Sequence, residues 1–418
     1  DLEERSMKHY IDHSLAISDH VPVVIEIVDD SAPETGRGRW KMTTEDLKDK
    51  YLMEEIRKIM NKCDKEGNKT PVKSWLDSKR KIRNLTESRQ ATCRKERGAH
   101  LADLKKQQND LTRRTDFKTN IGLQNQESKI RDEIARIERT KLDRAAESAL
   151  ARYADKGESV NKYWFAIGRA VQESSIIRTL QRPDDQPATD TEKMLQIARA
   201  HDEALQSEPA MTASREEAIE EMKRTTSGKE MTLESVEILK ADLKTEEARK
   251  AIKGAQNGKA PGKDGIPYEF YKYWVKHLEE NKDEDTKIPD IARILTRAWN
   301  EVSEDQPAPE EYVQGLMFLL HKKKERDKIQ NYRPITLLNS DYKLQTKAMT
   351  NRLRECVDNV IHPDQAEFVP GRDILDHVKL AKVVKEYCDT EEVDGCLVAL
   401  DQEKAYDKID HKYMWEIL

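Results

Sequence analysis

The sequence predicts a protein of the α+β class, in which a long and mostly α-helical segment precedes a mixed domain of helices and strands. Charged residues make up 37% of the 418 residues and hydrophobic residues only 36%, which indicates a large solvated surface. From about residue 43 to 200 the sequence is rich in Lys, Arg, Glu and Gln, with sparse Leu and Ile. After residue 232, helical stretches alternate with short apolar runs and turn signals, which favours a mixed domain.

The charged middle segment has the periodicity of long helices. Apolar residues are spaced like one face of a helix in two sets, Leu101, Leu104 and Leu111, and Ile130, Ile134 and Ile137. We therefore expect long helices with narrow apolar stripes over this segment.

The first 28 residues differ from the helical segment. Residues 21–28 are rich in β-branched side chains and predict a strand, with Asp19 and His20 at its entrance. We expect this strand to have no sheet to join, so that its edge is exposed. Residues 29–39 are polar and contain glycine, which predicts a linker.

Composition excludes several classes of protein. The apolar runs are far shorter than the ~20 residues of a membrane-spanning helix, and the first residues do not resemble a signal peptide. We therefore expect a soluble intracellular chain. Five cysteines without a CxxC pair speak against a disulfide framework and a structural zinc site.

A basic segment over residues 79–114 contains 12 basic and 4 acidic side chains, although the net charge of the chain is −6. Such a run is either an ordinary solvated helix face or a surface that binds nucleic-acid phosphates. Composition alone leaves both interpretations open.

An apolar run over residues 396–400 predicts a buried strand that ends at Asp401. By itself, this aspartate is either a capping or turn residue or a functional carboxylate. A helix is expected from residue 411, with Asp410 as its N-cap.

Two further segments are candidates for binding phosphate. Residues 257–266 contain three glycines and a proline, which predicts a tight loop whose backbone N–H groups face phosphate or, alternatively, an ordinary turn. Residues 318–324 and 331–338 predict a hairpin that carries Lys322 and Arg333. Their cationic groups would neutralise a triphosphate.

Four segments, in this order, resemble the reverse transcriptase of non-LTR (LINE-type) retrotransposons: KAPGKDGIPYEFYK, FLLHKKKERDKIQNYRPITLLNSDYKLQTKAMTNRL, IHPDQAEFVPGRDI and VALDQEKAYDKI. The resemblance covers residues 231–418 and implies the fingers and part of the palm of a right-hand polymerase over residues 232–418. The stretch around Asp19 and His20 is similar to the closing motif of the apurinic-type endonuclease that precedes this polymerase. Residues 1–30 would then be an endonuclease remnant, and residues 31–231 a basic helical linker.

The resemblance implies a role for each matching residue. Asp401 matches the first catalytic aspartate, which ligates two Mg²⁺ ions. Gln402 would offer a backbone carbonyl to the same metal and the nucleotide, and Tyr406 would pack under the incoming sugar and exclude ribonucleotides. Lys322 and Arg333 match residues that bind the nucleotide triphosphate.

The resemblance also reaches the template and the endonuclease. Gln365, Gly371 and Arg372 match a stretch that supports template and nucleotide. Asp19 and His20 match catalytic residues of the endonuclease.

Two departures from the family pattern qualify these roles. His321 stands where the family usually has proline, next to Lys322. The aromatic-x-Asp-Asp motif that completes the metal site is absent, and the pairs at residues 29–30 and 184–185 lie in polar loops. One aspartate cannot hold two divalent ions, so we expect this chain to be a truncated fragment without polymerase activity of its own.

The sequence thus predicts part of an RNA-directed DNA polymerase for target-primed reverse transcription. Expected partners are an RNA template, a DNA primer or target and dNTPs, with Mg²⁺ as cofactor, no membrane, and the nucleus as location. Two alternatives remain: a non-catalytic helical protein that binds nucleic acid and derives from a decayed element, and a maturase-like reverse transcriptase.

Overall fold

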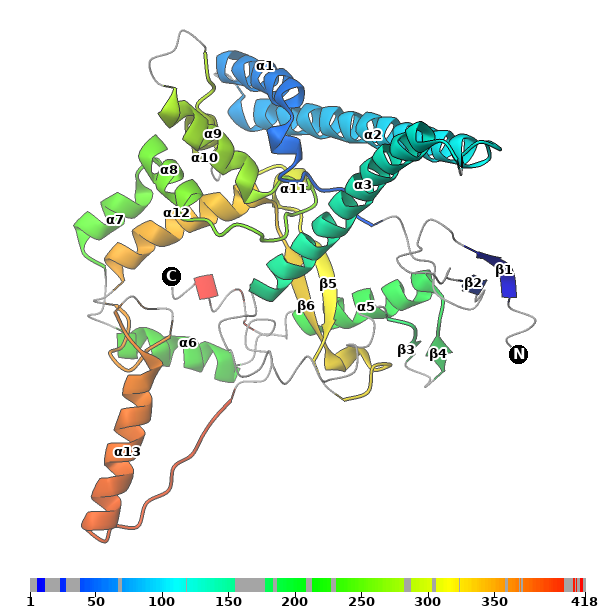
Figure 1. Ribbon diagram of the computed structural model, residues 1–418. Coiled ribbons are helices and arrows are strands. Elements are labelled where there is room, and N and C mark those ends of the chain that lie inside the picture. Colours follow the sequence, from blue (N-terminus) through cyan, green and yellow to red (C-terminus); the bar gives the residue numbers. More distant parts are fainter. Residues whose placement is uncertain are drawn as a thin grey trace.

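Among the residues that it describes, the computed structural model shows mostly helices, with three separate two-stranded sheets (Figure 1). It describes residues 6–11, 23–27, 38–66, 70–117, 119–154, 177–182, 186–207, 213–226, 231–281, 287–302, 306–322, 324–357, 360–367, 369, 371–401, 409, 411, 414 and 415. The prediction of helices with few strands is confirmed.

The largest hydrophobic core lies between two sets of helices that are distant in sequence. One set is α1 (Lys50–Glu66) and the first half of α2 (Pro71–Thr112). The other set is α8 (Thr245–Lys253), α9 (Tyr268–Glu280), α10 (Ile291–Glu301) and α12 (Ser340–Cys356). Figure 1 shows α1 and α2 lying against α9 and α10.

Amphipathic spacing explains why these helices form one core. In α10, Ile291, Ile294, Leu295 and Ala298 follow the period of a helix face, and all four are buried. From α2, Trp75 and Ile82 enter the same core. Residues 42–82, which the sequence assigned to a linker, therefore pack with residues 243–348, although the domain boundaries themselves stay a prediction.

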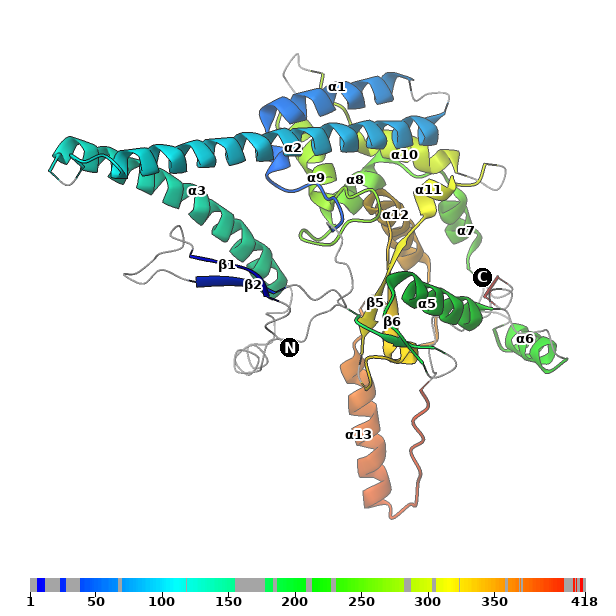
Figure 2. The same ribbon diagram turned by 90° about the vertical axis from the view of Figure 1, so that its right-hand side faces the viewer.

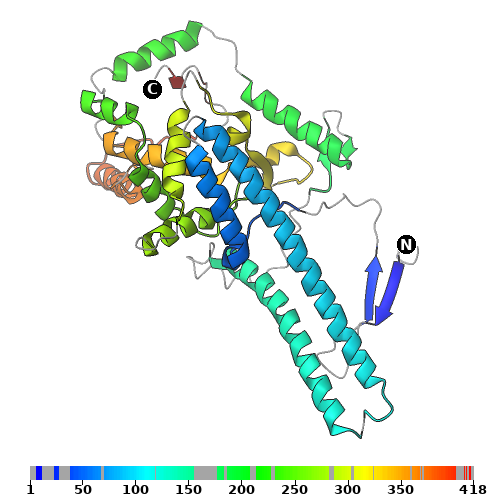
Figure 3. The same ribbon diagram turned by 90° about the horizontal axis from the view of Figure 1, so that it is seen from above.

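Helices α2 and α3 (Ile121–Ala154) form an antiparallel hairpin that projects from this core (Figures 2 and 3). Leu104 of α2 and Ile134 of α3, both on the predicted apolar stripes, are buried. The Gln108 amide donates to Glu127 Oε1 across the two helices at 2.8 Å. The expectation of long helices with narrow apolar stripes is confirmed.

Smaller elements complete the fold. They are η2 (Asp46–Lys48), α5 (Thr191–Gln206), α6 (Ala213–Thr226), α7 (Leu233–Lys240), α11 (Glu310–Val313), η3 (Ile329–Asn331) and α13 (Ile374–Thr390). Among the described residues, no helix combines the length and apolar character needed to cross a lipid bilayer.

Each sheet is an antiparallel pair of strands. The N-terminal pair is β1 (Ser6–Ile11) and β2 (Val23–Ile27), so the expectation that the strand within residues 21–28 lacks a partner is wrong. A preceding segment supplies the partner, which the composition of residues 21–28 could not reveal. The other pairs are β3 (Leu180–Gln181) with β4 (Pro187–Ala188), and β5 (Leu316–His321) with β6 (Tyr332–Leu337).

The strand predicted over residues 396–400 does not form. These residues are irregular, and Leu397 and Leu400 are 87% and 92% exposed. A strand needs hydrogen bonds from a neighbour. None of the described strands pairs with this segment, so its apolar sequence stays in solvent.

We predict that the first half of α2 supports the stability of the whole core. Ile82→Ala should lower the free energy of unfolding by about 2–5 kcal/mol, because Ile82 is fully buried and its removal leaves a cavity. The control is Ile121→Ala, at a position 72% exposed, which should change it by less than about 0.5 kcal/mol. Urea unfolding measures both, and equal effects would contradict the packing of α2 in this core.

Candidate functional site

The β5–β6 hairpin places the two predicted phosphate-binding cations on one face. Leu320 pairs with Arg333, and the Lys322 amide donates to the Asn331 carbonyl at 2.9 Å, which extends the same register. Cross-strand partners share a face, and so do residues two apart along a strand. Lys322 and Arg333 are therefore diagonal neighbours on the hairpin that the sequence predicted. Both are exposed, and neither forms an ion pair with another described residue.

The opposite face of the hairpin is anchored in a second, smaller core. Tyr332 is buried there with Leu180, Met194 and Ile329, and Leu319 packs against them. Packing on this face leaves the face of Lys322 and Arg333 toward solvent, where a ligand can reach it.

His321, the departure from the family pattern, stabilises the turn of this hairpin. Its ring packs edge-on against Tyr332 with centroids 5.3 Å apart, and its Nε2 lies within hydrogen-bonding distance, 3.1 Å, of the Lys324 carbonyl. Lys324 has a left-handed backbone with φ of 71°, which a bulky residue adopts only under constraint. The histidine thus contacts both ends of the turn, and Lys322 keeps its place in the register.

The glycine loop at residues 257–266 does not hold phosphate in the way considered from the sequence. Its N–H groups are used internally: Asp264 donates to Asn339 Oδ1 at 3.1 Å, and Gly265 donates to the Gly262 carbonyl at 3.2 Å. The Gly258 amide likewise donates to the Glu269 carboxylate at 2.6 Å. The loop is a packing turn, which was the alternative interpretation.

Close contacts explain the glycines of this loop. At Gly262, a side chain would overlap the backbone of Asn339. At Gly265, φ is +73° and a Cβ would lie 2.5 Å from Cε3 of Trp40. The loop is thus pressed between the segment before α1 and the start of α12.

A buried cluster of charges lies beside this loop. Lys79 Nζ of α2 is 2.8 Å from both Asp264 Oδ2 and Asp341 Oδ2, and Trp75 Nε1 donates to Asp341 Oδ2 at 2.7 Å. The side chains of Lys79 and Asp341 are buried, and that of Asp264 is 12% exposed. We call Lys79, Asp264 and Asp341 the buried triad.

Electrostatics keep Lys79 charged inside the protein. Burial lowers the pKa of Lys79, but the attraction of Asp341 and then of Asp264 outweighs burial and raises this pKa above its usual value. Burial raises the pKa of Asp264, and repulsion from Asp341 adds to that effect. Lys79 therefore belongs to the core and not to the solvated basic face expected over residues 79–114.

Arg372 organises the loop that the sequence assigned to template support. Its guanidinium donates to the carbonyls of His362 at 2.6 Å and Gln365 at 2.9 Å. Gly371 beside it has φ of +77°, and the exposed Gln365 side chain donates to the Glu367 carbonyl at 3.2 Å. Arg372 and Gln365 are thus brought together, whereas contact with template stays a prediction.

The remaining predicted residues are only partly described. Asp401 is exposed at the end of the irregular segment. Gln402, Tyr406, Asp19 and His20 lie outside the described residues. Within the described part of the chain, no three His, Cys, Asp or Glu side chains gather to hold a metal ion, so Asp401 by itself does not fit the two expected Mg²⁺ ions.

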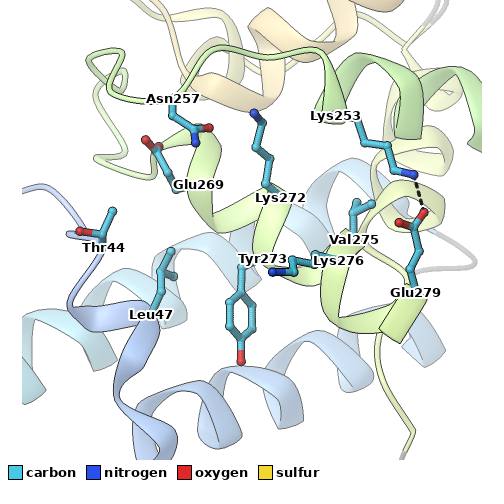
Figure 4. A pocket seen from close by; sticks show the side chains of 10 residues that line it. All are labelled: Thr44, Leu47, Lys253, Asn257, Glu269, Lys272, Tyr273, Val275, Lys276 and Glu279. Carbon is cyan, nitrogen blue, oxygen red and sulfur yellow. Dashed lines mark ion pairs between the residues drawn. The ribbon is translucent and has the colours of Figure 1, made fainter. Parts of the chain in front are cut away.

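A pocket elsewhere on the core is a second candidate for the binding site (Figure 4). It has a volume of about 470 Å³ and lies between α9, the end of α8 and the segment before α1. Lys253 and Glu279 form an ion pair of 2.7 Å at its rim, and Lys276 pairs with Glu280 at 3.6 Å. The charges of these two pairs are already neutralised, and none of the site residues predicted from the sequence lines the pocket. Both observations disfavour the pocket as a triphosphate site.

The C-terminal part of the chain is similar to known proteins. Residues 320–418 match the family model described as reverse transcriptase (RNA-dependent DNA polymerase). This part of the chain therefore resembles the reverse transcriptase family. The matched reverse transcriptase region includes Lys322, Arg333, Arg372 and Asp401, and excludes the pocket beside α9.

Two transposon proteins resemble the chain. The "Transposon TX1 uncharacterized 149 kDa protein" of Xenopus laevis is 34% identical over 178 residues, which cover 43% of this chain and 13% of that protein. The "Probable RNA-directed DNA polymerase from transposon BS" of Drosophila melanogaster is 28% identical over 180 residues, 40% of this chain and 18% of that protein. The predicted resemblance to a retrotransposon reverse transcriptase is confirmed, and the chain spans less than a fifth of either relative.

We predict that the glycine loop tolerates alanine at one left-handed position and not at another. Gly258 and Gly265 have φ of +75° and +73°, but only at Gly265 does a Cβ meet other atoms within 4 Å. Gly258→Ala should cost about 1–2 kcal/mol of unfolding free energy from backbone strain alone. Gly265→Ala should cost clearly more, because Trp40 must move. Thermal and urea unfolding compare the two variants, and equal costs would contradict the close packing on Trp40.

Proposed function

We propose that this chain is part of an RNA-directed DNA polymerase that copies the RNA of a LINE-type retrotransposon from a primer at nicked target DNA. The observation that carries the proposal is the β5–β6 hairpin, which presents Lys322 and Arg333 together within the reverse transcriptase region. Names of the transposon relatives support the same activity.

The hairpin supplies what nucleotide binding requires. Phosphoryl transfer depends on positioning the triphosphate and neutralising its charge rather than on acid–base chemistry by the protein. The planar guanidinium of Arg333 can donate two parallel hydrogen bonds to phosphate oxygens, whereas the Lys322 ammonium acts as a point charge. Both are exposed and without a carboxylate partner among the described residues, so neither must break an ion pair to bind.

The proposal extends to the family's other positions. Asp401 would be one of several carboxylates that hold Mg²⁺, which reverse transcriptases generally use and which would supply positive charge to the nucleotide phosphates. Gln402 would offer its carbonyl, and Tyr406 would select against a 2′-hydroxyl. Residues 365–372 would support the template, and the nucleus would be the site of action.

For residues preceding the polymerase we propose the remaining predicted assignments. Residues 1–30, with Asp19 and His20, would derive from an apurinic-type endonuclease. Residues 31–231 would connect the two enzymes, and the early part of that connection, α1 and the first half of α2, would belong with the fingers because it shares the main core.

We predict that Arg333 and Lys322 bind dNTP. Arg333→Ala should raise the dissociation constant of the chain for dTTP by about 10- to 150-fold, since hydrogen bonds to charged groups contribute about 1.5–3 kcal/mol. Lys322→Ala should weaken binding as well. Lys328→Ala is the matched control, because Lys328 lies beyond the strands and pairs with Glu325 at 3.8 Å. Calorimetric titration measures all four proteins, and equal constants would contradict the site.

Primer extension on an RNA template tests the activity itself. A longer version that carries an aromatic-x-Asp-Asp motif after residue 418 should extend a DNA primer, and Asp401→Asn should abolish extension. Synthesis that survives Asp401→Asn would contradict the assigned metal ligand. No synthesis by the longer version, with dNTP binding intact, would favour the non-catalytic alternative.

We also predict that the exposed part of α2 binds nucleic acid through phosphates. Arg94, Lys95 and Arg97 are exposed on this helix, whereas Lys79 is buried. For about six phosphate contacts, affinity should fall by ~10³ or more between 50 and 200 mM salt. Changing these three residues to Gln should reduce the slope of log affinity against log salt concentration by the amount that about three phosphate contacts contribute.

The control for this surface removes the same charge elsewhere. Lys193, Arg199 and Arg224 lie on α5 and α6, and the two arginines are paired with Glu203 and Glu221. Changing these three to Gln should leave affinity for single-stranded RNA unchanged in filter binding. Equal losses from both triple variants would show that only net charge matters and would contradict a surface on α2.

A further inference from the structure

We infer that the buried triad positions the nucleotide-binding hairpin, so that Lys79 of α2 acts on Arg333 from inside the core. The inference rests on the proposed function of Lys322 and Arg333. It assigns a role in nucleotide binding to a helix that the sequence placed in a connector.

The hairpin joins the core at two roots, one before β5 and one after β6. At the first root, α11 ends at Val313 and β5 starts at Leu316, with two residues between them. At the second root, β6 ends at Leu337, and α12 starts at Ser340. Because such short connections leave little freedom, the orientation of both strands follows from how these roots are held.

Lys79 contacts both roots. Its ammonium lies 5.9 Å from the ring centroid of Tyr312 in α11, within the range of a cation–π interaction. The same ammonium pairs with Asp341, the second residue of α12. Tyr312 also packs edge-on against Tyr342 with ring centroids 5.5 Å apart, so the two roots touch each other above Lys79.

The glycine loop holds the second root from another side. Asn339 Oδ1 accepts the Asp264 amide at 3.1 Å, and the Ser340 hydroxyl donates to the Ile266 carbonyl at 2.7 Å. Asp264 pairs with Lys79 in turn. The junction between β6 and α12 is therefore connected by directional bonds to the loop and to α2.

Stability alone does not explain a buried triad of this kind. Removing charges from water costs so much that well-packed apolar replacements of buried ion pairs are often equally stable or more stable. Apolar contacts can slide, whereas ion pairs and hydrogen bonds fix direction and distance. A surface that must hold Lys322 and Arg333 against a triphosphate needs such fixed geometry, because misplacement of a binding group weakens its contacts.

The rigid base for this arrangement is α2 itself. Trp75 and Ile82 flank Lys79 on the helix and are fully buried in the main core. Trp75 adds a hydrogen bond of 2.7 Å to Asp341. Movement of α2 would therefore move both roots of the hairpin together.

A triple neutral variant tests the inference while keeping the core packed. Lys79→Met alone would leave two unpaired carboxylates in the core and is expected to unfold the protein. Lys79→Met with Asp264→Asn and Asp341→Asn removes all three charges, keeps the volumes similar and lets Trp75 keep an acceptor. Its unfolding midpoint in urea should be close to that of the unchanged protein.

Two measurements separate positioning from stability. Calorimetric titration with dTTP should show a dissociation constant raised about tenfold with an unchanged number of sites, whereas loss of folded protein would lower the number of sites. Amide hydrogen exchange should be at least tenfold faster in β5 and β6 and unchanged in α10. The control is Arg224→Gln, on the surface of α6 and paired with Glu221 at 2.5 Å, which should change neither readout.

The outcomes distinguish this inference from the proposed function. An unchanged dissociation constant together with unchanged exchange in β5 and β6, in a folded triple variant, would overturn the positioning role. Absence of dTTP binding by the unchanged protein would contradict the proposed nucleotide site, whereas the exchange measurement would still support or overturn the role of the triad in holding the hairpin.

Discussion

A single lysine inside the core connects the three parts of the chain on which the candidate site depends. Lys79 comes from a long helix, Asp264 from a glycine loop and Asp341 from the helix after the hairpin, and the Lys79 ammonium lies 2.8 Å from an oxygen of each aspartate. A buried charge is stable only with partners, so these three segments must fold together or not at all. The position of the β5–β6 hairpin therefore depends on these three segments folding together.

Local patterns were enough to predict the elements that depend on neighbours in sequence. The hairpin with Lys322 and Arg333 followed from two short apolar runs and the turn between them. The stripes with Leu104 and Ile134 likewise predicted α2 and α3, because the period of a helix is visible within a few turns. The reverse transcriptase motifs are also local in sequence, and they include the region that the family model matches, residues 320–418.

Contacts between distant segments could not be predicted in this way. Lys79 and Asp341 are 262 positions apart, and in sequence Lys79 is one cation among many in a basic run. The glycines at residues 262 and 265 were open to two interpretations because a tight loop can face phosphate or another part of the chain. Only the placement of Trp40 and Asn339 against them shows that they serve packing. One signal in the sequence could have suggested the triad: Lys79 follows Trp75 by four residues, so both lie on the same face of the helix.

The cationic and acidic parts of the candidate site differ in how they are held. Lys322 and Arg333 lie on one face of the β5–β6 hairpin, and the opposite face packs on buried residues. Asp401 follows an exposed apolar segment, and α13 before it also exposes large apolar side chains, among them Leu380, Val383 and Tyr387. Apolar surface of this extent is stabilised when another surface covers it, and an apolar run becomes a strand only when a neighbour supplies hydrogen bonds. Fixing the Asp401 carboxylate therefore requires a contact that the described residues do not supply, whereas these residues do hold Lys322 and Arg333 on one face of the hairpin.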